Sequence, residues 1–326
     1  MSPSAGAARR WSAQLYALVL ALGAGGVLAA GFSLVTGIGR VSVDRHSPRE
    51  LDVLGLTLSY PYANAPAIVL VALAAVGALV LAGGGRATAR LLAGQRRFQR
   101  RLGAMALRQE RDVLVFDDPA PQAFCAGLLR PRIYLSSGAV DALDPDALDA
   151  VIAHERRHRD RRDPIRVLLA TALSEALFFL PVVSRLRDRF VAVLELDADD
   201  AAIAVAGGNP AALASAMVVF DASASPAGAM GIAPERVDHL LGRPAPWRLP
   251  SRQVAIGALT VTALLVASWA AGQHALVRTS LAVPGLSRQP CVLVLASIPG
   301  LLAAMTIAWL RHRTSARLGG PDQSRH

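Results

Sequence analysis

The sequence contains no lysine, and all 34 of its basic side chains are arginines. This absence excludes a P-loop, a Schiff-base lysine and any other lysine-centred chemistry. Charged residues make up only 18% of the chain, against about 25% in an average soluble domain. Two cysteines are too few for a disulfide scaffold. With 53% hydrophobic residues and a mean hydropathy of +0.40, the chain is neither disordered nor an ordinary cytosolic enzyme. The composition indicates a membrane protein.

Four apolar stretches are long enough to cross about 30 Å of hydrocarbon, which takes roughly 20 residues of helix. They run over residues 13–35, 65–81, 254–271 and 291–310. The first is longer than the apolar core of a secretory signal, which has about 7–15 residues, so we expect a retained anchor. A fifth stretch, 165–183, carries Ser174 and Glu175. We expect it to be a helix of the globular part or a helix lying against the membrane.

The arginines orient the chain in the membrane. Residues 84–111 hold eight arginines against one acidic residue, Glu110, and further arginines precede the first span and follow the last. Because arginine-rich segments stay on the cytoplasmic side, we expect both termini and residues 84–250 to be cytoplasmic. These arginines flank membrane spans without interleaved aromatic residues, which favours lipid headgroups over nucleic acid as their partner.

Between residues 111 and 250 the pattern changes to that of an α+β domain. Short runs at 112–116, 123–128 and 132–136 are rich in β-branched and aromatic residues and lie between turn signals, which predicts strands of a small sheet. Asp144 and Pro145 predict the N-cap and first residue of a helix that reaches Arg159. The pair Asp163-Pro164 repeats this start signal. A further helix is predicted after Pro181, up to the two glycines at 207 and 208.

The first of these helices carries the sequence His154-Glu155-Arg156-Arg157-His158. Two imidazoles at positions i and i+4 project from one face of a helix, so both can hold one metal ion. Glu155 lies next to the first imidazole and can act as a general base toward a water at the metal. We therefore predict a zinc site with one zinc ion per chain.

A catalytic zinc takes three protein ligands and an open position. The helix after Pro181 offers Glu195 as the third ligand, with Asp199 one turn later as the acceptor for the distal N–H of a ligand imidazole. His239 and His274 are alternative ligands. The competing interpretation of this segment is an acidic helix face on which Asp197 and Asp200 are simply solvated.

The chain resembles the membrane-embedded gluzincin metallopeptidases, above all the metallopeptidase domain of bacterial β-lactam sensor–transducers of the BlaR/MecR type. Glu195 follows His154 by 41 residues, the same separation as in that domain, and the resemblance covers roughly residues 112–243. The residues that carry it are Ala123-Phe124, Gly127, Pro131, the strand at 133–135, Gly138, the His154–His158 motif, Asp163, Phe178-Phe179-Leu180-Pro181, Glu195 with Asp199, and Glu235-Arg236-Val237 ahead of Leu240-Leu241.

The resemblance implies an integral membrane metalloendopeptidase that hydrolyses peptide bonds by zinc-activated water, with Glu155 as the base. The substrate would be a cytoplasmic or membrane protein, such as a transcriptional repressor, cleaved in a regulatory role. Only about 16 residues follow the last predicted span, and without lysine there is no Ser-x-x-Lys, so we expect neither the penicillin-binding sensor domain of those transducers nor sensing by acylation. An HtpX-like quality-control protease stays open as the alternative, and so does homo-oligomerisation.

Two further classes fit less well. A non-catalytic adaptor with a structural zinc would be expected to have a closed, cysteine-rich site. A transporter would be expected to carry ionisable residues within its spans, and these spans hold essentially none.

The substrate is expected to add to the strand that contains Ala123, Phe124, Cys125 and Ala126, by β-augmentation. The arginines at 156, 157, 159, 161 and 162 crowd the end of the motif helix, and we expect solvated or lipid-facing side chains there rather than an oxyanion or substrate contact. The predicted domains are an N-terminal membrane domain at 1–83, a basic cytoplasmic linker at 84–111, a cytoplasmic zinc metallopeptidase domain at 112–250 and a C-terminal membrane domain at 251–326.

Overall fold

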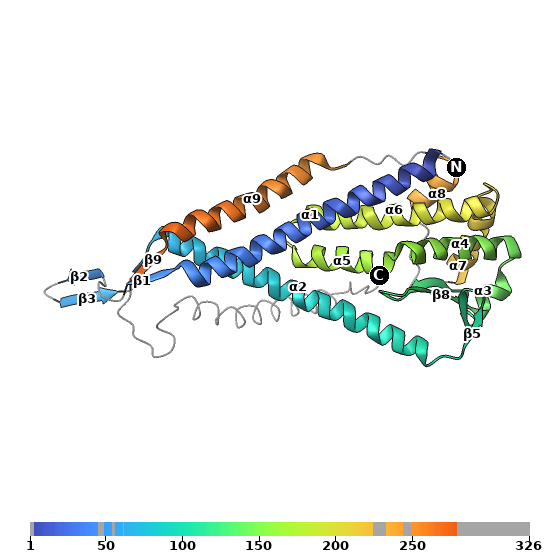
Figure 1. Ribbon diagram of the computed structural model, residues 1–326, viewed down its shortest axis with the longest axis horizontal. Coiled ribbons are helices and arrows are strands. Elements are labelled where there is room, and N and C mark those ends of the chain that lie inside the picture. Colours follow the sequence, from blue (N-terminus) through green and yellow to red (C-terminus); the bar gives the residue numbers. More distant parts are fainter. Residues whose placement is uncertain are drawn as a thin grey trace, which may run out of the picture. The chain divides into compact units, whose positions relative to one another are not determined.

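The computed structural model describes residues 3–44, 49–53, 56–60, 62–223, 233–243 and 249–278. Helices predominate in this part of the chain, beside small sheets, which confirms the predicted mostly helical α+β fold (Figure 1). Three of its helices are long and apolar enough to cross a membrane, and they correspond to the first three predicted spans. They are α1 (Pro3–Arg40), α2 (Ala65–Gly103) and α9 (Ser251–His274). The fourth predicted span, 291–310, lies outside the described residues.

The chain divides into two compact units, residues 1–24 with 84–257 and residues 25–83 with 258–326. In the second unit, α1 and α2 approach closely at glycines: a Cβ on Gly77 would lie 2.3 Å from the carbonyl oxygen of Ala30. The hydroxyls of Ser33 and Ser268 are hydrogen-bonded at 2.7 Å. Small residues and buried hydroxyls of this kind are typical of packed membrane helices.

Short strands occupy the connection between the first two helices, where the sequence indicated only a loop. Two of them form the antiparallel pair β2 (Arg49–Val53) and β3 (Leu56–Tyr60). The other sheet of this unit has the order β1–β9–β4, in which β1 (Ser42–Asp44) pairs parallel to β9 (Leu276–Arg278) and β4 (Tyr62–Ala63) pairs antiparallel to it.

The first unit contains a four-stranded sheet and six helices after α2. The strands are β5 (Leu107–Glu110), β6 (Val113–Phe116), β7 (Ala123–Ala126) and β8 (Arg132–Ser136). The helices are α3 (Ser137–Ala142), α4 (Pro145–Arg161), α5 (Asp163–Ala176), α6 (Pro181–Val205), α7 (Ala211–Ser223) and α8 (Pro234–Leu240).

The sheet has the order β5–β6–β8–β7, with β6 and β8 parallel and the other pairs antiparallel. All three predicted strands are present. Two glycines shape the turns beside β7: Gly127 has φ of 116°, which an L side chain rarely adopts, and a Cβ on Gly138 would lie 2.1 Å from the carbonyl oxygen of Pro119. The hydroxyl of Ser136 accepts hydrogen bonds from the N–H groups of Ala139 and Gln122, which joins the start of α3 to the segment before β7.

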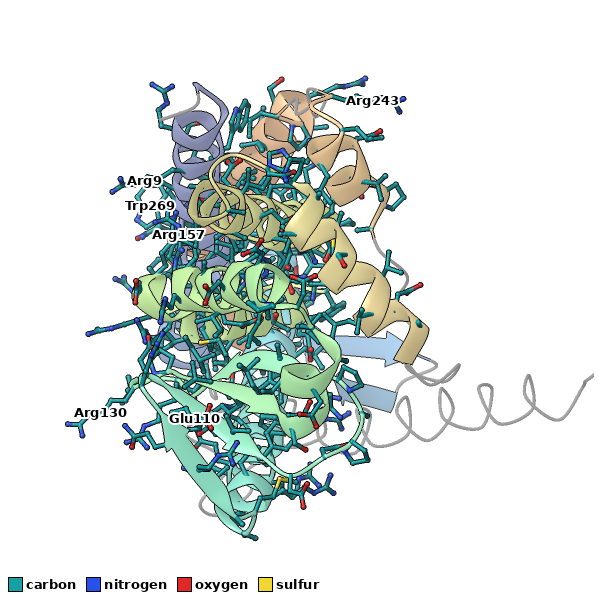
Figure 2. All side chains as sticks on the ribbon, turned by 90° about the vertical axis from the view of Figure 1, so that its right-hand side faces the viewer. Arg9, Glu110, Arg130, Arg157, Arg243 and Trp269 are labelled. Carbon is teal, nitrogen blue, oxygen red and sulfur yellow. The ribbon has the colours of Figure 1, made fainter. Side chains whose placement is uncertain are left out.

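Helix α4 lies between the sheet and α6, and α7 packs against it as well (Figures 1 and 2). It begins as predicted, with the carboxylate of Asp144 accepting from the N–H of Ala147 at 2.8 Å and Pro145 in its first turn. Its apolar face packs on the sheet in one core cluster. The buried members of that cluster are Val113, Ile133, Leu135, Leu143, Ala147, Val151 and Ala216.

The apolar stretch 165–183 is two helices rather than one. Helix α5 ends at Ala176 and α6 begins at Pro181, so α5 is about 21 Å long, too short to cross about 30 Å of hydrocarbon. The predicted role of Asp163 as a helix N-cap is wrong. Arg162, at φ of 54° and ψ of 42°, is the N-cap of α5, while the carboxylate of Asp163 is already bound to side chains of α4 and α5.

Residues 84–103 are the continuation of α2, and the arginines of this segment lie on that helix. Strand β5 follows and pairs with β6. The predicted domain boundaries at 84, 112 and 250 stay a prediction.

Candidate metal centre

The two motif histidines lie one turn apart near the end of α4. Their ring centroids are 4.9 Å apart, and the two Nε2 atoms face each other at 3.2 Å. Both side chains are almost entirely buried. Two imidazole nitrogens at this separation are favourable only if a proton or a cation lies between them.

Glu195 projects from α6 toward both histidines. Its Oε2 is 3.5 Å from His154 Nε2, and its Oε1 is 3.6 Å from His158 Nε2. Among the described residues, His154, His158 and Glu195 form the one cluster of at least three potential ligands whose donor atoms lie within 4.8 Å of one another. The structure therefore brings together the three residues that the sequence predicted as ligands.

The separations between these donor atoms fit a tetrahedral zinc ion. Zn–N and Zn–O bonds of about 2.0–2.1 Å at tetrahedral angles place neighbouring donors about 3.3–3.4 Å apart. The observed values of 3.2, 3.5 and 3.6 Å are close to this edge length. Three residues leave a fourth position open, as in a catalytic rather than a structural site.

Each histidine has an acidic partner at its other ring nitrogen. His158 Nδ1 lies 3.0 Å from Asp163 Oδ2 in a hydrogen bond, which fixes the tautomer with a lone pair on Nε2. His154 Nδ1 lies 2.9 Å from Asp199 Oδ1, although without the alignment of a hydrogen bond. Asp199 was predicted for this place. Asp163 was noticed in the sequence only as a helix start signal and as part of the family resemblance, not as a partner of His158.

Arg236 on α8 completes the surroundings of Glu195. Its guanidinium forms a bidentate pair with Asp199, with Nε donating to Oδ2 at 2.8 Å, and its Nη1 is 3.5 Å from Glu195 Oε2. Sequence reasoning assigned Arg236 no role, because it lies 37 residues beyond Asp199 and its partner is set by the docking of α8 on α6. The signal that pointed to it was the Glu235-Arg236-Val237 likeness.

The electrostatics of the site show a surplus of carboxylates around the two imidazoles. Burial opposes the charged form of His154, but the carboxylates of Asp199 and Glu195 outweigh it and raise the pKa of His154 to about 10. Burial also opposes ionisation of Glu195, yet His154 and other nearby positive charges lower its pKa to about 2. In the metal-free protein a proton on His154 thus balances charge that a divalent cation can balance instead.

Glu155 lies beside this cluster and is itself buried. Burial raises its pKa above the ordinary value, and the positive charges of His154 and His158 oppose that rise. A carboxylate with a raised pKa next to a ligand histidine is suited to accept and return a proton near neutral pH.

Four of the five arginines at the end of α4 contradict the expectation that they are solvated or lipid-facing, whereas Arg162 is exposed. Arg156 and Arg159 both bind Asp112 at the start of β6. Arg157 and Arg161 both bind Asp197, whose residue is 3% exposed (Figure 2). These four arginines link α4 to the sheet on one side and to α6 on the other, so they are structural.

The last acidic residue of the segment 195–200 is paired as well. Asp200 Oδ1 lies 3.0 Å from Nε2 of His239 on α8. Asp200 is therefore not simply solvated, and the structure does not bring His239 to the metal cluster as an alternative ligand. His274 lies in the other compact unit. The competing interpretation of α6 as a solvated acidic face is therefore wrong for Asp197 and Asp200.

Strand β7 borders the site and forms an edge of its sheet. It pairs with β8 alone among the described strands, and α4 packs against it. Burial and the nearby carboxylates of Glu155 and Asp163 raise the pKa of the Cys125 thiol to about 12, which indicates that this residue faces the site. On the other face, the Phe124 ring stacks on Tyr134 with centroids 5.4 Å apart. The role of residues 123–126 in substrate binding stays a prediction.

Comparison with known proteins identifies the class to which this fold and site belong. The sequence profile of the family described as "BlaR1 peptidase M56" matches residues 56–230. The chain therefore belongs to the M56 peptidase family, and it is a membrane metallopeptidase.

A second likeness points to a related class of protease. A segment that makes up 24% of this chain is 32% identical, over 84 residues, to "Protease HtpX" of Psychrobacter sp. (strain PRwf-1). The match spans 28% of that protein's length. No solved structure matches the chain.

Proposed function

We propose that the protein is a zinc-dependent membrane endopeptidase in which His154, His158 and Glu195 hold one zinc ion and Glu155 is the general base. The observation that carries this proposal is the cluster of donor atoms beside the buried Glu155: the two histidine Nε2 atoms lie 3.2 Å apart, and one oxygen of Glu195 lies 3.5 Å from the first while the other lies 3.6 Å from the second. Bound zinc supplies a Lewis acid that polarises a carbonyl group and lowers the pKa of water.

The chain's own residues perform the proton transfers and the positioning. The Glu155 carboxylate accepts a proton from the attacking water and later delivers it to the leaving amine nitrogen. Asp163 and Asp199 orient the two imidazoles, and Arg236 holds Asp199 and Glu195. The free edge of β7 holds an extended substrate segment beside the site.

We place the catalytic unit and both termini on the cytoplasmic side, because of the arginines on the α2 continuation and around the other spans. The substrate is then a cytoplasmic or membrane protein. The family description supports cleavage of a regulatory protein such as a repressor. The likeness to an HtpX protease supports the second candidate, the removal of damaged proteins.

The test is cleavage by the full-length chain in detergent, with zinc per chain measured on the same samples. Wild type is expected to bind about one zinc and to cleave. Glu155→Gln is expected to keep its zinc and to lose at least about 100-fold in rate, the contribution typical of a general base. Glu110→Gln, which removes an exposed carboxylate of β5, is the matched control and keeps full activity.

Two outcomes would contradict the proposal. Cleavage by Glu155→Gln at the wild-type rate would show that Glu155 is not the general base. Zinc binding unaffected by Glu195→Ala would show that Glu195 is not the third ligand. The two candidate functions are separated by the substrate. A quality-control protease degrades unfolded casein at many positions, whereas a regulatory protease cuts a single protein at one bond.

A further inference from the structure

The N-terminal part of α1 contacts the residues that support the metal ligand His158. The Tyr16 ring of α1 stacks on Phe190 of α6, with centroids 5.1 Å apart. The Arg166 guanidinium of α5 lies over both rings, with its Cζ 4.7 Å from the Tyr16 centroid and 5.0 Å from the Phe190 centroid. Arg166 Nη1 donates to Asp163 Oδ1 at 2.7 Å, and Asp163 Oδ2 accepts from His158 Nδ1 at 3.0 Å.

In this chain of contacts each residue fixes the next. The two oxygens of Asp163 are divided between Arg166 and His158, so the direction of the Arg166 bond decides how the carboxylate meets the imidazole. The Arg166 guanidinium is held in turn by cation–π contacts with both stacked rings. Phe190 is fully buried, and Tyr16 lies within the first candidate membrane span, residues 8–40. Both belong to the same compact unit as the site.

A second contact ties the same face of α1 to the end of α4. The hydroxyl of Ser12, four residues before Tyr16 and fully buried, accepts a hydrogen bond from Arg161 Nη2 at 3.0 Å. Arg161 also donates to Asp197 at 2.7 Å. Because residues four apart share a helix face, α1 contacts the residues around His158 at two points about one turn apart, Ser12 and Tyr16.

We propose that α1 positions the metal ligand His158 through Tyr16, Arg166 and Asp163, so that a displacement of this membrane helix changes how tightly the site holds zinc. Tyr16 and Arg166 are positioning residues, because neither is a ligand. The 29 residues from Trp11 to Gly39 carry no charge, and the helix is continuous from residue 3 to residue 40. Tyr16 therefore belongs to the same unbroken helix as the apolar residues that follow it. This inference rests on the zinc site of the proposed function.

The test measures zinc affinity of the full-length protein by competition with a chelator, and the visible spectrum of the Co²⁺-loaded protein, which reports ligand geometry without any turnover. Tyr16→Leu keeps apolar volume but removes the ring face, and Tyr16→Phe keeps the face. Arg166→Gln removes the cation. Phe98→Ala is the matched control: it removes an aromatic ring of α2 that packs on Phe124 at 5.4 Å, outside the chain of contacts.

We expect Arg166→Gln to weaken zinc binding about 10-fold, the lower end of the range for partners of metal ligands, and to shift the Co²⁺ spectrum. Tyr16→Leu is expected to do the same to a smaller extent, about 3-fold, and Tyr16→Phe and Phe98→Ala to match wild type. Because Tyr16 acts through Arg166, the double variant Tyr16→Leu/Arg166→Gln is expected to be no weaker than Arg166→Gln alone.

Three results would overturn the proposal. Wild-type zinc affinity and Co²⁺ spectrum in Tyr16→Leu would show that α1 does not position His158, even if Arg166→Gln is altered or does not fold. An equal loss in Tyr16→Phe would show that the ring face is not what acts. Zinc binding by the double variant that is much weaker than zinc binding by Arg166→Gln would show that Tyr16 and Arg166 act separately. If Glu195→Ala also bound zinc as wild type does, the proposed zinc site itself would fail, which is a distinguishable result.

Discussion

Asp199 is the residue whose change is most informative about the metal centre. Its side chain is fully buried, one oxygen faces His154 Nδ1 at 2.9 Å, and both oxygens bind Arg236. Asp199→Asn keeps the shape and an oxygen acceptor but removes the charge that makes His154 a stronger ligand. Loss of such a partner typically weakens metal binding 10- to 100-fold, which corresponds to about 1.4–2.7 kcal/mol at about 1.4 kcal/mol per tenfold.

The cost to folding is expected to be limited. Breaking a fully buried ion pair costs about 3–5 kcal/mol. Here the side chain of Arg236 is 22% exposed and still has Glu195 at 3.5 Å, so the loss stays below that range. The variant should therefore fold and allow its zinc affinity to be measured.

The assay is chelator competition at pH 7.5, with Asp200→Asn as the control. Asp200 is the next residue and its side chain is only 10% exposed, but its partner is His239, which is not in the metal cluster. We expect a large loss of affinity in Asp199→Asn and none in Asp200→Asn. Wild-type affinity in Asp199→Asn, or an equal loss in both variants, would refute the argument that Asp199 acts through His154.

Three further predictions follow from the charges. Because the pKa of His154 is raised to about 10 in the metal-free protein, zinc binding between pH 7 and 9 is expected to release about one proton, measurable by titration calorimetry in buffers of different ionisation enthalpy; no release would contradict the charged imidazole. For the same reason His154 stabilises the folded metal-free protein. This contribution is fully present below the unfolded-state pKa of about 6.5 and is lost as pH rises through about 10. Thermal unfolding at about pH 6 and about pH 10.5 tests this, with the zinc-loaded protein as control. The hydrogen bond from Arg156, joined by Arg159, lowers the pKa of Asp112, so its contribution is present above the unfolded-state pKa of about 3.9 and is lost as pH falls below it. Asp112→Asn should flatten the acid side of the stability curve, and an unchanged acid side would contradict the pairing.

Local rules were sufficient to predict the elements that build the site. The N-cap Asp144 and the proline after it set the start of α4, and the i, i+4 spacing then put two imidazoles on one face of that helix. Glu195 and Asp199 were predicted by the same one-turn logic on α6. The structure brings these side chains together as expected, because each prediction depends on the geometry of one helix. Their roles as zinc ligands and ligand partner stay a prediction.

Partners far apart in the sequence were not predictable in the same way. Asp112 precedes Arg156 by 44 residues, and their pairing depends on where β6 begins relative to α4. Strand β5 was missed because its four residues are all exposed and show no apolar alternation, so only its pairing with β6 makes it a strand. Arg236 and His239 acquire their roles when α8 docks on α6, which is a tertiary event.

The acidic segment of α6 shows how the three candidate metal ligands are held in place by the fold. Its carboxylates diverge around the helix: Asp197 faces Arg157 and Arg161 of α4, whereas Glu195 and Asp199 face the histidines. A shift of α6 by one residue would rotate Asp197 by about 100° away from its arginines, leaving a 3%-exposed carboxylate without partners. That cost fixes the register between α4 and α6, and the same register puts Glu195 within 3.6 Å of both imidazoles. The arginine–aspartate pairs, which touch no ligand, therefore preorganise the site.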